Sequence, residues 1–156
     1  MRPSNLKRNC RNTKVIAEYS YNFVDQKPEM FNSSPEGDKI YIKRVQNSDE
    51  QMSALDNILT KLIKAEKIDP EDIAILSGLS ESKNNIWKNR KQLSFKITKS
   101  SKRNGEIYFS TIKKFKGLDK DVVILADISR SLDSKDMYTG CSRAKNKLYI
   151  IELSSN

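Results

Sequence analysis

Short apolar runs alternate along the chain with segments whose apolar residues recur every three or four positions. Residues 72–76 (DIAIL) and 121–126 (DVVILA) are apolar runs of the kind found in parallel strands that are covered on both faces. Weaker strand-like patterns occupy residues 39–45, 93–98, 107–112 and 148–153.

Three segments have helical spacing. The first begins at Asn12 or Thr13 and ends near Asp25, the second runs from Ser48 to near Lys67, and the third opens at Asp133 or Ser134. Strands that alternate with helices predict an α/β layer fold with a mostly parallel sheet, in which ligands gather at the carboxyl ends of the strands.

Length and composition limit the fold to one soluble domain. The chain has 156 residues, of which 37% are hydrophobic, and this is enough for one core. No run approaches the ~18 to 20 apolar residues of a membrane span, and the start lacks the apolar core of a signal peptide. We therefore expect a single domain over residues 1–156, located in the cytoplasm and without membrane contact.

The chain has no histidine and two cysteines, Cys10 and Cys141. The absence of histidine excludes a His-based triad, a His general base and a His metal site, and two cysteines are too few for a zinc cluster. We assign the cysteines no chemistry and expect no metal ligands in this chain.

Positive charge is concentrated in one segment. The formal net charge is +9, and residues 83–120 hold twelve basic side chains against two acidic ones. Such a cluster attracts a phosphate backbone, and aromatic rings among the cations can stack on unpaired bases, which favours single-stranded nucleic acid. In the alternative reading the cations form a solvated face and the aromatic side chains turn into the core. The rings concerned are Trp87, Phe95, Tyr108, Phe109 and Phe115.

Three segments at predicted element boundaries carry groups suited to phosphate: NCRNT (9–13), STIKKFKGLD (110–119) and YTGCSRA (138–144). Together they indicate a nucleotide-handling edge. Arg11 and Arg143 are suited to neutralising charge on a transferring phosphoryl group, because a guanidinium stays charged and binds phosphate oxygens in pairs.

These segments occur in the order of three helicase motifs, and the chain resembles the C-terminal, RecA-like motor domain of UvrD/Rep-like superfamily 1 DNA helicases. In that family, motif IV is close to N-Y-R-[SN]-T, motif V to S-T-I-H-K-x-K-G-L-E and motif VI to Y-V-[AG]-x-[ST]-R-A. The resemblance covers nearly the whole chain and implies a three-layer α/β domain of the P-loop NTPase type.

The resemblance also implies roles at the nucleotide. Arg11 and Arg143 would reach the γ-phosphate of ATP as arginine fingers, which contribute roughly 10³ to 10⁵ in rate. Gly117 would shape the turn of motif V, and Asp119 would approach the ribose.

A second set of motif V residues is expected at single-stranded DNA. By the same resemblance these side chains would lie near the DNA backbone: Ser110, Thr111, Lys113, Lys114 and Lys116.

The chain departs from the family pattern at three positions. Lys113 replaces a histidine, Asp119 replaces a glutamate and Cys10 replaces a tyrosine. The distance from Leu76 to Ser110 is also too short for the helical subdomain that related helicases insert there.

No G-x-x-x-x-G-K-[ST] loop occurs in the sequence. We therefore expect ATP and Mg²⁺ to be held mainly by a separate N-terminal RecA-like domain, and the isolated chain to be inactive as an ATPase. The primary hypothesis is the C-terminal motor half of an ATP-dependent DNA helicase. The alternatives are a helicase-derived nucleic-acid-binding module without ATPase activity, and an interaction domain that retains only the fold.

Overall fold

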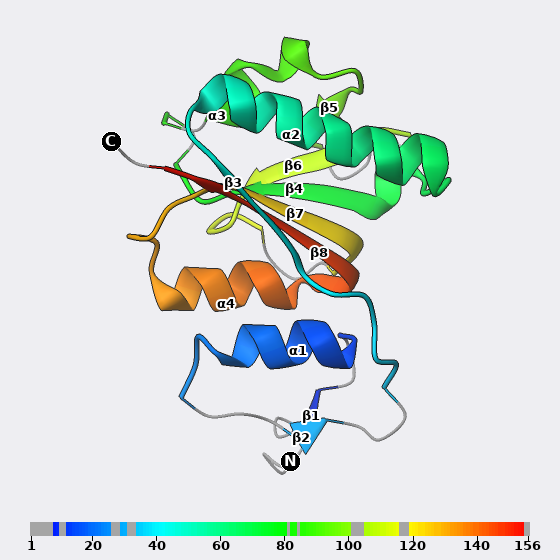
Figure 1. Cartoon of the computed structure of the whole chain (residues 1–156), viewed down its shortest axis with the longest axis vertical. Helices are drawn as coiled ribbons and strands as arrows, with labels where there is room; N and C mark the ends of the chain where they lie inside the picture. The colour runs from blue at the N-terminus through cyan, green and yellow to red at the C-terminus, as the bar shows by residue number, and fades with distance from the viewer. Residues whose placement is uncertain are drawn as a thin grey trace.

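The computed structural model describes residues 8–9, 12–25, 29–30, 34–80, 82–83, 85–100, 105–115 and 119–154. Its centre is a sheet in which six strands run parallel in the order β3-β8-β7-β4-β6-β5 (Figure 1). The expected α/β fold with a parallel sheet is confirmed. The strands are β3 (Tyr41–Val45), β4 (Ile73–Ser77), β5 (Ile97–Thr98), β6 (Ile107–Thr111), β7 (Lys120–Ile128) and β8 (Ala144–Leu153), and a separate parallel pair joins β1 (Arg8–Asn9) to β2 (Glu29–Met30).

Helices cover both faces of the sheet, which gives the three layers of a RecA-like domain. Helix α2 lies on one face and α4 on the other, and α1 packs on the outer side of α4 (Figure 1). The helices are α1 (Lys14–Tyr21), α2 (Ser48–Thr60), α3 (Asn85–Lys88) and α4 (Ser134–Ser142); a π-helical turn (Lys61–Ala65) continues α2, and 3₁₀ turns occupy Pro70–Asp72 and Arg90–Gln92.

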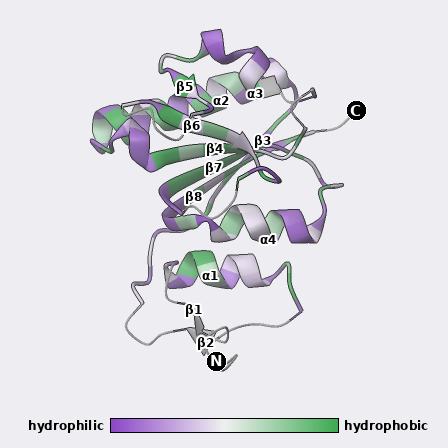
Figure 2. Ribbon diagram, turned by 180° about the vertical axis from the view of Figure 1, so that it is seen from behind, coloured by the Kyte–Doolittle hydropathy of each residue, from purple (hydrophilic) through white to green (hydrophobic). Residues whose placement is uncertain are grey.

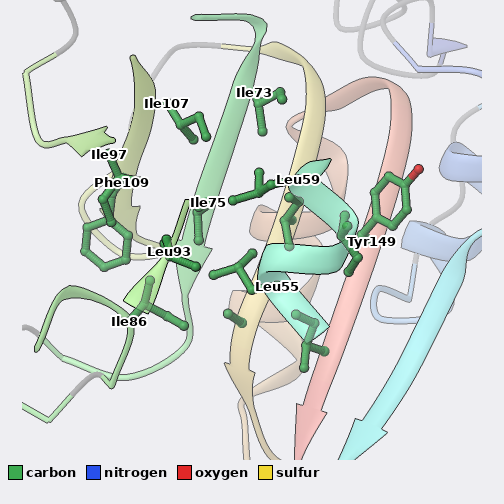
Figure 3. Packing of buried hydrophobic residues seen from close by; sticks show 14 of the residues in the cluster. Leu55, Leu59, Ile73, Ile75, Ile86, Leu93, Ile97, Ile107, Phe109 and Tyr149 are labelled. Carbon is green, nitrogen blue, oxygen red and sulfur yellow. The ribbon is translucent and has the colours of Figure 1, made fainter. Parts of the chain in front are cut away.

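Each central strand contributes alternate side chains to two cores, as the period of two in a strand requires. In β4, Ile73 and Ile75 join the core under α2, whereas Ala74 and Leu76 join the core under α4. The hydrophobic colour in Figure 2 is concentrated on the strands accordingly. In Figure 3, side chains of α2, including Leu55, point onto the sheet beside those of β4.

Several element boundaries differ from the sequence prediction. Helix α1 ends at Tyr21 rather than near Asp25, and the pattern at 93–98 yields only the short strand β5. Strands β7 and β8 extend beyond their apolar runs, because polar residues at their ends still pair in the sheet. At the start of α2 the cap is Asn47, whose Oδ1 accepts from the Glu50 N–H at 2.9 Å.

The spacing of Ser48 and Gln51 in the sequence is that of a capping box, but the structure has the cap one position earlier, at Asn47. Glu50 completes the capping arrangement, since its Oε2 accepts from the Gln46 N–H at 2.5 Å. This leaves Gln51 free to turn inward, where its side chain is fully buried.

The parallel sheet has two distinct edges. We call the edge where the strands end, at Val45, Ser77, Thr111, Ile128 and Leu153, the carboxyl edge, and the edge where they begin the amino edge.

Candidate functional site

Arg143 and Asp119 lie together at the amino edge. Arg143 separates the end of α4 from the start of β8, and Asp119 immediately precedes β7. Since β7 and β8 are neighbours, the Lys120 N–H donates to the Arg143 carbonyl at 3.1 Å. The Nη1 atom of Arg143 lies 4.0 Å from Oδ1 of Asp119.

The environment of Arg143 suits an anionic ligand. Its side chain is 21% exposed, and its Nε atom is buried without a hydrogen-bond partner among the described residues. The distance to Asp119 exceeds that of a normal hydrogen bond, so the guanidinium is held near a carboxylate without a bidentate pair. A guanidinium in this state is suited to binding a phosphate oxygen.

Asn12 fixes the backbone on either side of Arg143, and the sequence analysis gave it no such role. Its Nδ2 donates to the Ser142 carbonyl at 2.9 Å and to the Ala144 carbonyl at 2.5 Å. The side chain is 3% exposed, and the next residue, Thr13, caps α1. Asn12 and Thr13 therefore meet the segment around Arg143 at the amino edge. In the sequence, Asn12 is recognisable only as a residue next to a helix cap. Its hydrogen-bond partners could not be predicted, because they lie about 130 residues away and are brought near by the tertiary fold.

A cavity of about 500 Å³ opens at the carboxyl edge. Ser77 at the end of β4 and Thr111 at the end of β6 stand on its wall, and these two residues are directly paired in the sheet. The turn after β6 brings Lys113 and Lys114 to the same cavity. The complete lining is Ser77, Gly78, Leu79, Ser80, Ser82, Thr111, Ile112, Lys113, Lys114 and Asp136.

Thr111 builds this turn. Its Oγ1 accepts from the Lys114 N–H at 3.3 Å, and its carbonyl accepts from the Phe115 N–H at 3.1 Å. Ser110 is buried in β6 and donates its hydroxyl to the Thr111 carbonyl at 3.1 Å, so it supports the turn from beneath.

Lys113 projects from the turn. Its side chain is 81% exposed and its Nζ lies 3.9 Å from Oδ2 of Asp136 on α4. An exposed pair at this distance contributes little and leaves the ammonium accessible to a phosphate.

The site residues expected from the sequence thus divide between two edges. The interpretation of segments 9–13, 110–119 and 138–144 as one nucleotide-handling edge is not what the structure shows. Asp119 and Arg143 lie together at the amino edge, and Thr111, Lys113 and Lys114 lie together at the carboxyl edge. Of the remaining candidates, Arg11, Lys116 and Gly117 lie outside the described residues, as does Cys10.

Two aromatic side chains of the basic segment are buried in the core, as in the alternative reading, whereas Trp87, Phe95 and Tyr108 are partly buried against it. Phe109 and Phe115 are 1% and 2% exposed. Trp87 stacks on Phe109 with ring centroids 5.5 Å apart, while Arg90 and Lys99 lie 4.2 and 4.5 Å from the centre of its ring. The rings of Phe109 and Phe115 are therefore not available as a platform for bases.

We also searched the described part of the chain for a metal site, a membrane-spanning helix and a reactive cysteine. Within it, no group of three or more His, Cys, Asp or Glu side chains could hold a metal ion, and no helix is long and apolar enough to cross a membrane. Burial raises the pKa of the Cys141 thiol to about 12, so this cysteine is not a nucleophile at neutral pH.

Comparison with known proteins agrees with this geometry. Residues 106–151 match the family model of the UvrD-like helicase C-terminal domain. The structure superposes on that of the C-terminal domain of a possible DNA helicase from Lactobacillus plantarum WCFS1, with a TM-score of 0.69 at 18% identity, covering 92% of this chain and 86% of that one. No curated protein matches the chain.

The fold is the α/β fold of a helicase C-terminal domain, and residues 106–151 are similar in sequence to that domain of UvrD-like helicases. The resemblance to the C-terminal domain of UvrD/Rep-like helicases is confirmed. The family match includes the segments resembling motifs V and VI, and the fold extends the likeness over nearly the whole chain.

Proposed function

We propose that the chain is the C-terminal motor half of an ATP-dependent DNA helicase or translocase. In this proposal Arg143 supplies an arginine finger to ATP held by a partner RecA-like domain, and the carboxyl edge binds single-stranded DNA. Arg11, Gly117 and Lys116 keep their proposed roles from the resemblance.

One observation carries the proposal: the segment resembling motif V connects the two edges. Thr111 and Lys113 stand at the carboxyl-edge cavity, and Asp119, eight positions after Thr111, stands beside Arg143 at the amino edge. The chain links Thr111 covalently to Asp119, and Asp119 lies 4.0 Å from Arg143, so in this proposal a shift of the segment on DNA binding reaches the arginine through that contact.

The amino edge fits the nucleotide. Bound ATP with its Mg²⁺ supplies the phosphoanhydride whose hydrolysis releases energy and whose transition state carries excess negative charge. Arg143 contributes positive charge there through a side chain that is 21% exposed. Asp119 holds the guanidinium within 4.0 Å and orients it across the edge. The Mg²⁺ ligands belong, in this proposal, to the partner domain with its P-loop.

DNA binding is tested on the chain itself. The affinity for fluorescein-labelled oligothymidine is measured by fluorescence anisotropy between about 50 and 200 mM salt. The double variant Lys113→Glu/Lys114→Glu should bind at least about tenfold more weakly and lower the slope of log K against log salt by about 1.4, since each lost phosphate contact removes about 0.7 from the slope.

The matched control is Lys64→Glu/Lys67→Glu, which changes the charge by the same amount near the amino edge, where both side chains are exposed. It should leave the slope unchanged. Equal losses in both double variants would mean that net charge, and not the carboxyl edge, determines binding. Absence of binding by the unmodified chain at low salt would leave only the interaction-domain hypothesis.

A second candidate function is the DNA-binding module without ATPase activity. Lys113 favours it, because a cation replaces the histidine of the family pattern and lies exposed at the cavity. The two functions differ in one result: in a protein that joins the chain to a P-loop domain, Arg143→Ala abolishes ATP hydrolysis only if the chain completes the ATP site.

A further inference from the structure

The carboxyl edge contains a second cavity, which the motifs do not include. It has a volume of about 280 Å³ and lies at the ends of β7, β8 and β3. Its lining residues are Arg44, Ile128, Ser129, Arg130, Glu152, Leu153 and Ser154.

We propose that the bound single strand continues from the first cavity into this second one, where Arg130 contacts a phosphate. This inference rests on the proposed binding of DNA at the first cavity and extends it to a site on the other half of the carboxyl edge.

The chemistry of the two cavities is alike. The first combines serine and threonine hydroxyls with two lysines and one aspartate, and the second combines two serines with two arginines and one glutamate. Each therefore has a net charge of +1 and hydroxyl donors, a composition suited to a phosphate and sugar backbone.

Arg130 is the side chain available to a ligand in the second cavity. Arg44 is engaged, because its Nε donates to Oε1 of Glu152 at 2.7 Å. Arg130 is exposed and makes no ion pair or side-chain hydrogen bond within the described residues. A guanidinium held at the end of β7 without a protein partner can bind phosphate oxygens in pairs.

The two cavities are separated by the backbone around Gly78 and Asp127, which is closely packed. Gly78 lines the first cavity, and a Cβ at this position would lie 2.9 Å from the Asp127 carbonyl and 3.1 Å from Cδ1 of Ile128, which lines the second. The loop that begins at Gly78 thus packs directly against the end of β7.

Asp127 ties the two walls together. Its carboxylate accepts from Ser77 Oγ at 2.7 Å and from Gln51 Nε2 at 2.8 Å, and its N–H donates to Gln51 Oε1 at 2.8 Å. It does so with a φ of 55°, in the left-handed region that a non-glycine residue adopts at an energetic cost. The end of β7 is therefore hydrogen-bonded directly to the end of β4 between the two cavities.

The separation suits a continuous strand. The first cavity spans β4 and β6 and the second spans β7, β8 and β3, so their centres are about two and a half strands, or roughly 12 Å, apart. A single strand of a few nucleotides covers this distance.

The test compares oligothymidines of two lengths with the unmodified chain, Arg130→Gln and Arg130→Glu. An oligomer of about 2 nucleotides is confined to the first cavity, whereas one of about 12 can reach both. We expect Arg130→Glu to weaken binding of the longer oligomer by about five- to tenfold and to lower its salt slope by about 0.7, with binding of the shorter one unchanged. Arg130→Gln should give the same change in slope with a smaller loss of affinity.

Three results would overturn the inference. If both Arg130 variants equal the unmodified chain at both lengths while Lys113→Glu/Lys114→Glu weakens binding, the second cavity is not a DNA site and the proposed function stands. If Arg130→Glu weakens both lengths equally, no separate subsite exists. If the unmodified chain binds neither length, the proposed function fails together with the inference. Circular dichroism confirms folding of each variant.

Discussion

Asn12 offers the sharpest test of how the amino edge is built. Replacing it by alanine removes the two hydrogen bonds that its Nδ2 donates to the carbonyls of Ser142 and Ala144. Each such bond contributes about 1 kcal/mol net, and a buried group that loses its partner costs about 1 to 3 kcal/mol. We therefore expect Asn12→Ala to lower the free energy of unfolding by about 2 to 4 kcal/mol, which corresponds to roughly 5 to 15 °C in Tm.

Asn12→Asp separates hydrogen bonding from packing. The side chain keeps its shape, but an oxygen replaces the NH₂ group and faces two carbonyl oxygens. Its loss of stability should equal or exceed that of the alanine variant. Urea unfolding followed by circular dichroism measures both, with Asn57→Ala on the exposed side of α2 as the control. A change within about 0.5 kcal/mol for Asn12→Ala would refute the reasoning, since that is the usual range for surface substitutions.

The same substitution should act on ATP hydrolysis through Arg143. The two carbonyls flank this residue, so their release moves the guanidinium without changing the carboxyl edge. In the protein joined to its P-loop domain, folded Asn12→Ala should show a lower kcat and an unchanged Kd for DNA. A positioning role is excluded if kcat is normal at a temperature well below the Tm.

Three further predictions concern buried and paired groups. Cys141 should not react with a thiol reagent at neutral pH in the folded Cys10→Ser variant and should react in urea, because its pKa is about 12; reaction before unfolding would contradict its burial. Lys147→Met should lower stability at neutral pH, and the difference should diminish as the pH falls below the ordinary Asp38 value of 3.8, since the Lys147 ion pair lowers the pKa of that carboxyl; urea midpoints measured against pH test this. Gln51→Leu should lower the free energy of unfolding by about 2 to 5 kcal/mol in urea, because two buried hydrogen bonds to Asp127 are lost. An unchanged free energy would refute the structural role given to Asp127 between the two cavities.

Much of the fold was predictable because it follows from local pattern. The apolar runs at 72–76 and 121–126 became the central strands β4 and β7, and helical spacing located α1, α2 and α4. Where prediction failed, the cause was tertiary. The ends of β7 and β8 are polar and are held in the sheet by their neighbours, and Trp87 is held against the core by stacking on Phe109.

The residues of the candidate site could be predicted from the sequence, but their separation into two groups at opposite edges of the sheet could not. Sequence order places Thr111 and Asp119 in one motif, and only the direction of β6 and β7 shows that the motif crosses from the carboxyl edge to the amino edge. Arg130 carries no motif signal. It becomes a candidate because the sheet places the end of β7 next to the end of β4.

We propose that the amino edge acts on ATP and that the carboxyl edge binds DNA. The most direct test is DNA-stimulated ATP hydrolysis in the protein that joins the chain to a P-loop domain. The account predicts that Arg143→Ala lowers kcat by about 10³-fold or more with an unchanged Kd for single-stranded DNA. It predicts the converse for Lys113→Glu/Lys114→Glu, with weaker DNA binding and unchanged hydrolysis in the absence of DNA. Normal hydrolysis by Arg143→Ala, or equal effects of both variants on both quantities, would contradict it.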